Sequence, residues 1–120
     1  MTAPLALIIE DEEVLAEIYT VALQMAGFET EVVGDGQQAL TRLAEIVPTL
    51  VILDLHLPRV SGAEILHHIR GDERLSNTKV ILATAQDRLA DSLRAQANLT
   101  LLKPISPEQL RLLALRLCPR

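Results

Sequence analysis

The sequence lacks several features that mark common protein classes. It contains one cysteine, Cys118, so an internal disulfide is excluded and a reducing compartment is indicated. The longest apolar runs, residues 5–9 and 50–53, are far shorter than the roughly 20 residues that a membrane helix requires. The N-terminus has no basic segment followed by an apolar stretch and a small-residue cleavage site. We therefore expect a cytoplasmic protein with no secretory signal and no membrane span.

Basic charge and aromatic side chains are also scarce. The 11 Lys and Arg residues against 16 Asp and Glu residues give a formal net charge of −5. Such a chain has no positive field that would attract nucleic acid or anionic lipid, so we expect it to bind neither directly. Aromatic residues make up 2% of the sequence, which leaves too few rings to enclose a flavin. The 49% of hydrophobic residues suffice for a buried core, and the length suits a single domain over residues 1–120.

Short apolar runs alternate with longer stretches in which apolar residues recur at helical spacing. Strands are predicted at residues 5–9, 29–33, 50–53, 79–83 and 99–102. A helix is predicted after each strand. The apolar faces predicted for these five helices are, in order, Val14, Ile18, Val21, Ala22 and Met25; Ala39, Leu40, Leu43 and Val47; Ile65, Leu66 and Ile69; Leu89 and Leu93; and Leu110, Leu113, Ala114 and Leu117.

This alternation predicts an α/β fold with a parallel sheet that is covered by helices on both faces. The first, third and fourth strands are continuous apolar runs, as buried parallel strands are. The second and fifth strands mix polar and apolar residues, so we place them at the two edges. The resulting order is 2-1-3-4-5, the flavodoxin-like doubly wound (βα)5 arrangement. Its switch point, where a site is expected, lies between the first and third strands.

Polar residues follow four of the predicted strands. Because the carboxyl ends of parallel strands meet at one edge of a sheet, these residues should lie close together. They are Glu10, Asp11, Asp54, Thr84 and Lys103. Two carboxylates about 4 Å apart repel by roughly 4 kcal/mol at an effective dielectric constant of 20, so a bound cation is implied. Oxygen ligands without a Cys or a His pair favour Mg²⁺, with Mn²⁺ as a substitute.

Helix capping is the alternative explanation for the acidic residues 10–13, because acidic side chains are favoured in the first turn of a helix. That explanation does not extend to Asp54, which lies several residues before Ser61, where the next helix could begin. A carboxylate beside a divalent cation stays ionised and can attack phosphorus to form an acyl phosphate. Lys103 and Thr84 have the right chemistry to hold the equatorial oxygens in such a transfer.

Together these motifs resemble the receiver domain of two-component response regulators over essentially the whole chain. The matching segments are Glu10-Asp11, Asp54-x-x-x-Pro58-x-x-x-Gly62, Ala83-Thr84-Ala85, Lys103-Pro104 and Gly36-x-x-Ala39-Leu40. The resemblance implies that Asp54 accepts a phosphoryl group from a sensor histidine kinase, from a phosphotransfer protein, or from a small donor such as acetyl phosphate. Its catalytic activity would be confined to its own phosphorylation and dephosphorylation.

The resemblance also implies roles for the other site residues. Glu10, Asp11, Asp54 and the backbone carbonyl of His56 would hold the Mg²⁺ ion, while Thr84 and Lys103 would hold the phosphoryl group. Pro58, Gly62 and Pro104 would set the loop geometry, and the Lys103-Pro104 bond is commonly cis in the family. His56 and Gln86 lie where family members vary the access of hydrolytic water, so we expect them to set the phosphoryl lifetime.

Three positions depart from the family pattern. Thr100 stands where the family usually has a Tyr or Phe that swings inward on phosphorylation. Ile105 replaces a common Phe, and Gln96 replaces a common Gly. Because Thr100 puts the usual relay in question, the main alternative is a degenerate receiver that acts as a phosphorylation-independent interaction module.

Two other protein families and a histidine metal site fit the sequence less well. A flavodoxin would need a phosphate-binding loop where residues 10–13 are acidic. A phosphatase of the haloacid dehalogenase type commonly has a second Asp at the position of His56. The adjacent His67 and His68 cannot bind one metal from one helix face, so we interpret them as surface residues.

The expected output surface is the face built from the fourth helix, the fifth strand and the fifth helix. Phosphorylation would change this face, where a partner or a second copy of the chain could dock. The residues proposed for the contact are Leu89, Leu93, Leu110 and an exposed Arg111.

Overall fold

The structure, a computed structural model, describes residues 3–85 and 87–119. Five parallel strands form one sheet in the order β2-β1-β3-β4-β5, which confirms the predicted topology and fold class. The strands are β1 (Leu5–Ile9), β2 (Glu29–Val33), β3 (Leu50–Asp54), β4 (Lys79–Thr84) and β5 (Leu99–Leu102). β3 and β4 are each one residue longer than predicted, so Asp54 and Thr84 end their strands rather than follow them.

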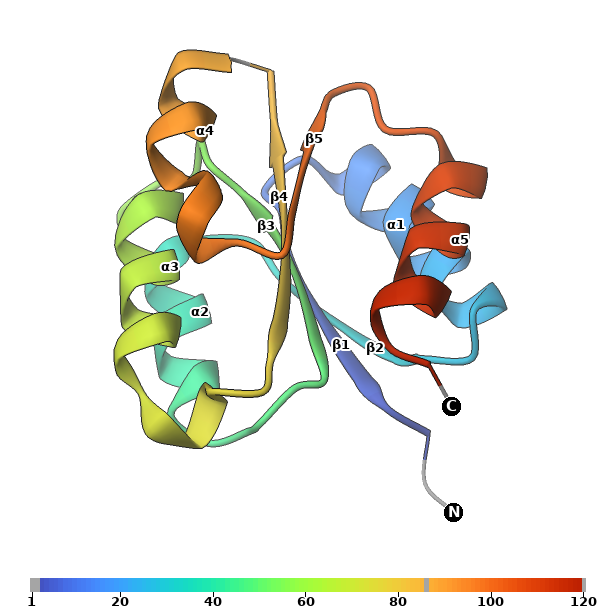
Figure 1. Cartoon of the computed structure of the whole chain (residues 1–120), viewed down its shortest axis with the longest axis horizontal. Coiled ribbons are helices and arrows are strands. Elements are labelled where there is room, and N and C mark those ends of the chain that lie inside the picture. Colours follow the sequence, from blue (N-terminus) through green and yellow to red (C-terminus); the bar gives the residue numbers. More distant parts are fainter. Residues whose placement is uncertain (1–2, 86, 120) are drawn as a thin grey trace.

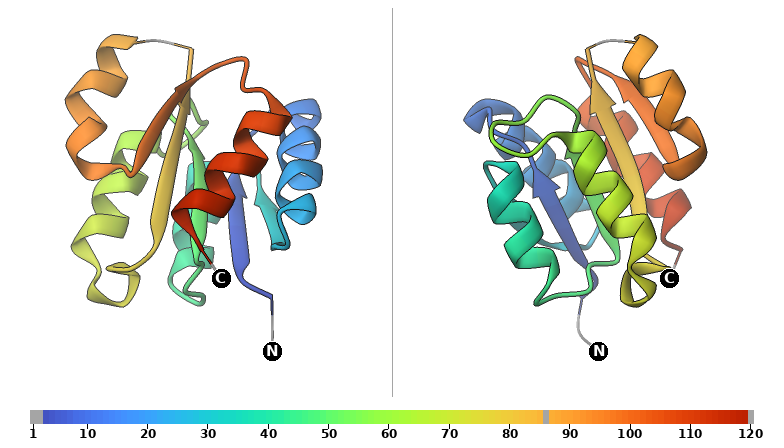
Figure 2. Two further views of the ribbon diagram at one scale, coloured as in Figure 1. Left: turned by 45° about the vertical axis from the view of Figure 1, so that its right-hand side comes forward. Right: turned by 90° about the vertical axis from the view of Figure 1, so that its left-hand side faces the viewer.

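Helices cover both faces of the sheet (Figure 1). α1 and α5 lie on one face, and α2, α3 and α4 lie on the other. Their bounds are α1 (Glu13–Met25), α2 (Gly36–Leu43), α3 (Gly62–Gly71), α4 (Asp87–Leu93) and α5 (Pro107–Leu117), with short 3-10 helices η1 (Glu73–Leu75) and η2 (Arg94–Gln96). All strands point toward one end of the molecule, and both chain termini lie at the other end (Figure 2). No helix in the described part of the chain is long and apolar enough to cross a membrane.

In the described part of the chain, three α-helices begin at a side chain that accepts a hydrogen bond from the first turn. Asp35 caps α2, Ser61 caps α3 and Ser106 caps α5. These caps satisfy backbone N–H groups that have no partner inside the helix, which typically stabilises a helix by about 1 kcal/mol. The cap at Ser61 confirms that Asp54 lies too early in the chain to serve α3.

The central strands bury side chains on both faces of the sheet, as predicted for continuous apolar runs. The core between the sheet and α2, α3 and α4 includes Leu7, Ile9, Val51, Leu53, Val80, Leu82, Leu43, Leu66 and Leu93. The core between the sheet and α1 and α5 includes Ala6, Ile8, Ile52, Ile81, Ala83, Tyr19, Leu23, Leu110 and Ala114. The edge strands β2 and β5 have only partly buried side chains over most of their length.

The buried face predicted for the first helix was largely wrong. Val14, Val21 and Met25 are 65%, 50% and 70% exposed. Ala22 is buried and Ile18 partly buried, as predicted, but the other side chains that α1 buries are Ala16, Tyr19 and Leu23. α1 has two apolar stripes at helical spacing, and its packing against the sheet and α5 selects the stripe that carries the larger buried side chains.

The other helix faces agree better with the prediction. Ala39, Leu43, Ile65, Leu66, Ile69, Leu93, Leu110 and Ala114 are buried. Val47 is 56% exposed because α2 ends at Leu43. Arg111 is half-buried rather than exposed, and its guanidinium forms an ion pair with Glu108 in the same helix. Gln86 and the side chain of Leu89 lie outside the described residues.

Candidate functional site

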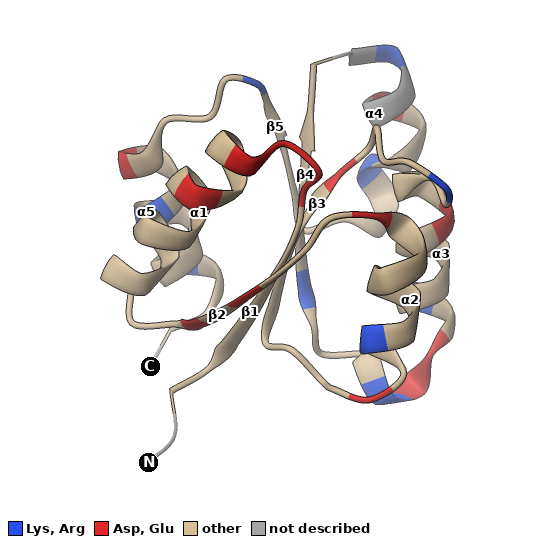
Figure 3. Ribbon diagram, turned by 180° about the vertical axis from the view of Figure 1, so that it is seen from behind, with Lys and Arg blue, Asp and Glu red and all other residues tan. Residues whose placement is uncertain are grey.

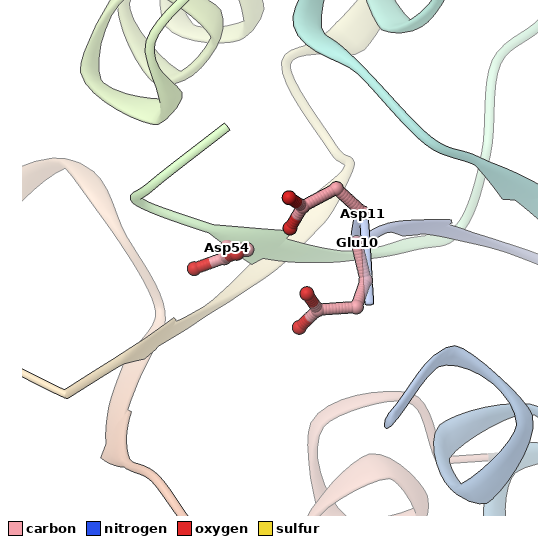
Figure 4. Close-up of side chains that lie close together, drawn as sticks. All are labelled: Glu10, Asp11 and Asp54. Carbon is pink, nitrogen blue, oxygen red and sulfur yellow. The ribbon is translucent and has the colours of Figure 1, made fainter. Parts of the chain in front are cut away.

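Three carboxylates meet beyond the carboxyl ends of β1 and β3. Glu10, Asp11 and Asp54 each offer an oxygen atom, and these atoms lie within 4.8 Å of one another. Figure 4 shows the three side chains turned toward a common space, and Figure 3 shows the acidic residues at this end of the sheet. Glu10 and Asp54 are 2% and 3% exposed, whereas Asp11 is open to solvent. An all-oxygen donor set with one accessible side fits a hard divalent cation such as Mg²⁺.

Neighbouring strands place Glu10 and Asp54 side by side. Ile9 pairs with Leu53 in the sheet, so the two acidic residues that follow occupy adjacent strand ends. The backbone N–H of Glu10 donates to the carbonyl of Val33 at 3.1 Å, and its Oε2 accepts from the N–H of Glu12 at 3.2 Å. The side chain of Glu10 therefore has a defined orientation from both its own strand and the start of α1.

Lys103 reaches the same cluster from the loop after β5. Its Nζ donates to Oε1 of Glu10 at 2.9 Å and lies 3.4 Å from Oδ1 of Asp54. The backbone N–H of Lys103 donates to the carbonyl of Thr84 at 2.8 Å, which ties this loop to the end of β4. The Lys103-Pro104 bond is cis, as the resemblance implied. The structure thus brings one ammonium group against two buried carboxylates.

Burial and charge act against each other in this cluster. Burial raises the pKa of Glu10, Asp54 raises it further, and the hydrogen bond from Lys103 opposes both, with a net increase. Burial alone would lower the pKa of Lys103, but its hydrogen bond to Glu10 and the charge of Asp54 raise it above its usual value. The two increases have different causes, because burial disfavours the charged form of Glu10, whereas two carboxylates favour the charged form of Lys103. The hydrogen bond from Lys103 therefore does not fully offset the burial of Glu10 and the charge of Asp54, so a further cation at this cluster would be favourable.

Of the other predicted site residues, Thr84 and His56 lie next to Asp54. Thr84 is fully buried at the end of β4, one residue beyond the partner of Asp54 in the sheet. The exposed His56 follows β3, and its backbone N–H donates to Oδ1 of Asp54 at 3.1 Å. Thr100 is half-buried in β5, opposite Leu82. Gln86 lies outside the described part of the chain.

Close backbone contacts explain why glycine occupies position 62. A Cβ atom at Gly62 would lie 2.5 Å from the carbonyl oxygen of Asp54 and 2.6 Å from the Cα of Leu55. The N–H of Gly62 donates to the carbonyl of Leu55 at 3.2 Å, which folds the loop containing Pro58 back onto the end of β3. The start of α3 is therefore packed directly against the backbone of Asp54.

Tyr19 is the site neighbour that the sequence did not reveal. Its side chain is 1% exposed and belongs to the core under α1 and α5, together with Ala83 and Ile105. These two residues adjoin Thr84 and the Lys103-Pro104 bond. The spacing of Ala16, Tyr19 and Leu23 on one helix face was the signal that could have identified its position.

Comparison with known proteins identifies the family. The model of the response regulator receiver domain matches residues 6–114. The chain belongs to this family. Among curated relatives, the DNA-binding response regulator MtrA of Mycobacterium tuberculosis is 37% identical over 107 residues, which are 87% of this chain and 46% of that protein. The chain thus spans about half the length of the curated relatives that it matches.

Solved receiver structures agree with this fold. The chemotaxis response regulator CheY4 of Vibrio cholerae has a TM-score of 0.87 at 25% identity. The superposition covers 98% of this chain and 100% of the CheY4 chain. The receiver domain of the sensor histidine kinase PA1611 from Pseudomonas aeruginosa has a TM-score of 0.85 at 25% identity. The superposition covers 96% of this chain and 97% of the PA1611 receiver chain. That structure holds a magnesium ion in the active site cleft.

Proposed function

We propose that this receiver domain is a phosphorylatable switch in which Asp54 accepts a phosphoryl group with the help of Mg²⁺. The observation that carries this proposal is the meeting of Glu10, Asp11 and Asp54 within 4.8 Å beside the ammonium of Lys103. The magnesium ion in the related PA1611 receiver supports the same metal here. Glu10, Asp11, Asp54 and the carbonyl of His56 would hold it, and Mn²⁺ would substitute.

In the proposed transfer, an Oδ atom of Asp54 attacks the phosphorus of a phosphohistidine. The new O–P bond forms as the P–N bond breaks, and the imidazole leaves as a neutral ring when its other nitrogen already carries a proton. With acetyl phosphate as donor, the P–O bond breaks and acetate leaves. Bound Mg²⁺ would supply positive charge to the phosphoryl oxygens. Thr84 at the end of β4 and Lys103 in the loop after β5 would hold the other oxygens, and the backbone N–H of Lys103 donates to the carbonyl of Thr84, which ties the two segments together.

The loops around Asp54 would control how long the phosphoryl group lasts. We propose that Pro58, Gly62 and Pro104 hold these loops in place. The exposed His56, with Gln86, would set the access of water to the acyl phosphate. The modified state would then change the α4-β5-α5 face, through which the domain would meet a partner or a second copy.

The proposed donor is a sensor histidine kinase or a phosphotransfer protein in the cytoplasm. MtrA is named a DNA-binding regulator, but this chain covers 46% of its length. For residues 1–120, which we propose act as a single receiver domain, the net charge of −5 argues against direct contact with DNA.

A phosphorylation-independent interaction module is the second candidate function. It is favoured by Thr100, a half-buried hydroxyl residue where the family usually has an aromatic relay side chain. The preserved cluster of Glu10, Asp54 and Lys103 supports the phosphorylated switch instead.

Incubation with acetyl phosphate, with Mg²⁺ or with EDTA, tests the proposal by intact mass. We expect one added phosphoryl group that requires the metal and is lost in Asp54→Asn. Asp91→Asn is the matched control, because Asp91 is 62% exposed and pairs only with Arg94 among the described residues. Absence of labelling by any donor, together with persistent partner binding, would establish the interaction module in place of the switch.

A further inference from the structure

The loop between β3 and α3, residues 55–61, packs against the start of α2. The two helices α2 and α3 lie side by side on one face of the sheet (Figure 2). The buried Gly36, the first residue of α2, donates its backbone N–H to the carbonyl of Pro58 at 3.2 Å. At the end of the loop, the N–H of Gly62 donates to the carbonyl of Leu55 at 3.2 Å. The loop is therefore attached both to the helix that follows it and to α2, which precedes it in the sequence.

The absence of a side chain at Gly36 allows this close approach. A Cβ atom at Gly36 would collide with the carbonyl oxygen of Val60 and would lie 2.6 Å from the Val60 Cβ. Any side chain at this position would therefore force the loop and α2 apart. Gly34 differs, because a Cβ atom there meets nothing within 4 Å. Two glycines that are two residues apart thus have opposite tolerance for a side chain.

The centre of the loop adopts a rare backbone conformation. Arg59 has a φ of 71°, and no other non-glycine residue in the described part of the chain has a positive φ. The N–H of Val60 donates to the carbonyl of Pro58 at 2.9 Å, which closes a three-residue turn around Arg59. A turn of this kind with a positive φ at its centre is rare and strained.

Contacts of the Arg59 side chain do not account for this conformation. The side chain is 72% exposed, and its Nε lies 3.7 Å from Oδ2 of Asp35. An exposed ion pair of this kind contributes little to stability. Strained backbone persists only where its surroundings impose it, and here the residues on both sides of Arg59 are docked on Gly36. The start of α2 therefore holds the turn in place.

The same loop carries an expected metal ligand near its beginning. In the proposed function the carbonyl of His56 binds Mg²⁺, and the N–H of His56 donates to Oδ1 of Asp54 at 3.1 Å. Only Leu57 separates His56 from Pro58, so the direction of the His56 carbonyl depends on where Pro58 is held. Groups that orient a metal ligand without touching the metal typically change metal affinity 10–100-fold when they are altered.

We infer that the first turn of α2 positions the metal-binding loop, with Gly36 holding the strained turn of residues 58–60 so that the carbonyl of His56 faces the metal site. This inference rests on the proposed function. Gly36 and Arg59 act through His56 and touch neither the metal nor the phosphoryl group, so they are positioning residues. The β2-α2 connection thus contributes to Mg²⁺ affinity although it supplies no ligand.

Two substitutions of Arg59 test this inference with the same change of charge. Arg59→Gly can keep a φ of 71°, whereas Arg59→Pro fixes φ at roughly −65° and cannot form this turn. In calorimetry, Arg59→Pro should bind Mg²⁺ about tenfold more weakly than Arg59→Gly. In EDTA, hydrogen exchange at the Gly36 amide should be faster in Arg59→Pro, because the Pro58 acceptor has moved. Equal Mg²⁺ affinity of these two variants would overturn the inference.

Gly36→Ala tests the same contact from the side of α2. We expect it to bind Mg²⁺ about tenfold more weakly than the parent. Gly34→Ala is the matched control and should bind Mg²⁺ like the parent, because its Cβ has space and its φ is not positive. If Gly36→Ala fails to fold, the two variants at the exposed Arg59 still decide the question.

Failure of this inference can be told apart from failure of the proposed function. A parent protein that binds Mg²⁺ and takes a phosphoryl group, while Arg59→Pro and Arg59→Gly bind the metal equally, would refute the role of α2 only. A parent protein that binds no Mg²⁺ would refute the proposed function and this inference with it.

Discussion

Lys103 and Glu10 are 93 positions apart in the sequence, yet the Lys103 ammonium donates to the Glu10 carboxylate at 2.9 Å. The carboxylate is nearly inaccessible, and the lysine is mostly buried. A second carboxylate, that of Asp54, lies 3.4 Å from the same ammonium. The single ammonium of Lys103 therefore lies against two buried carboxylates, and a change of either Lys103 or Glu10 alters the charge balance of the site.

We predict that Glu10→Gln stabilises the metal-free domain and weakens its binding of Mg²⁺. Because the pKa of Glu10 is raised on folding, the ionised form is less favourable in the folded protein than in the unfolded one. Below the ordinary glutamate pKa the parent bears no such cost. As the pH rises through that value and then through the raised folded value, the parent loses stability relative to the variant. Urea unfolding in EDTA from acidic to neutral pH measures this divergence.

Glu45→Gln is the control for this experiment, since Glu45 is 62% exposed and lies outside the site. Its stability difference from the parent should stay small throughout the pH range. Saturating Mg²⁺ should reverse the order of Glu10→Gln and the parent, because only the parent retains the full set of carboxylates. A parallel pH dependence of the parent and Glu10→Gln would contradict the prediction.

We predict that Lys103→Ala lowers the stability of the metal-free domain by about 1–3 kcal/mol, because it leaves the buried Glu10 without its donor. The same change should strengthen Mg²⁺ binding, since it removes a positive charge that competes for the carboxylates. Phosphorylation by acetyl phosphate should nevertheless slow. Denaturation with and without Mg²⁺, calorimetry and intact mass measure the three effects.

The other lysine of the chain provides the control. Lys79 begins β4 at the opposite end of the sheet, so Lys79→Ala should leave both Mg²⁺ affinity and phosphorylation unchanged. Weaker Mg²⁺ binding by Lys103→Ala would show that Lys103 does not compete with the metal.

We predict that Gly62→Ala destabilises the domain by about 1–3 kcal/mol, as expected where an added methyl group forces the backbone to move. The added Cβ would lie 2.5 Å from the carbonyl oxygen of Asp54, so the phosphorylation rate should also fall. Gly71→Ala is the control at the end of the same helix, where a Cβ meets nothing within 4 Å. That variant should be neutral or more stable by about 0.5–1 kcal/mol. Similar unfolding curves for the two variants would disprove the close contact at Gly62.

We predict that Leu23→Ala costs about 2–5 kcal/mol, the usual range for a leucine removed from a packed core. Leu23 is fully buried, whereas Met25 on the same helix is 70% exposed. Met25→Ala should therefore change stability by no more than about 0.5 kcal/mol. Chemical denaturation of both variants checks which stripe of α1 faces the sheet, and a larger loss for Met25→Ala would reverse the assignment.

The strand order and the approximate place of the site could be predicted from the sequence. Alternating strands and helices force parallel pairing, and parallel pairing sends every strand end to one edge. The prediction that Glu10, Asp11 and Asp54 would meet there needed no knowledge of side-chain packing. The polar residues of β2 and β5 likewise identified the edge strands.

The buried stripe of α1 could not be predicted in the same way. Helical periodicity sets the angles between Val14, Val21 and Met25, but it does not set the rotation of the helix against the sheet. With apolar residues on two sides of the helix, only the fit of Tyr19 and Leu23 into the core decided the outcome.

By itself, the sequence determined the fold, the sheet order and the edge at which the acidic residues gather, because these follow from local patterns and from the polarity of parallel strands. Only the tertiary structure decided that Lys103 pairs with Glu10 and that the buried hydroxyl of Tyr19 has no hydrogen-bond partner among the described residues. Both depend on how segments distant in the sequence pack together, and no periodicity within one segment carries that information.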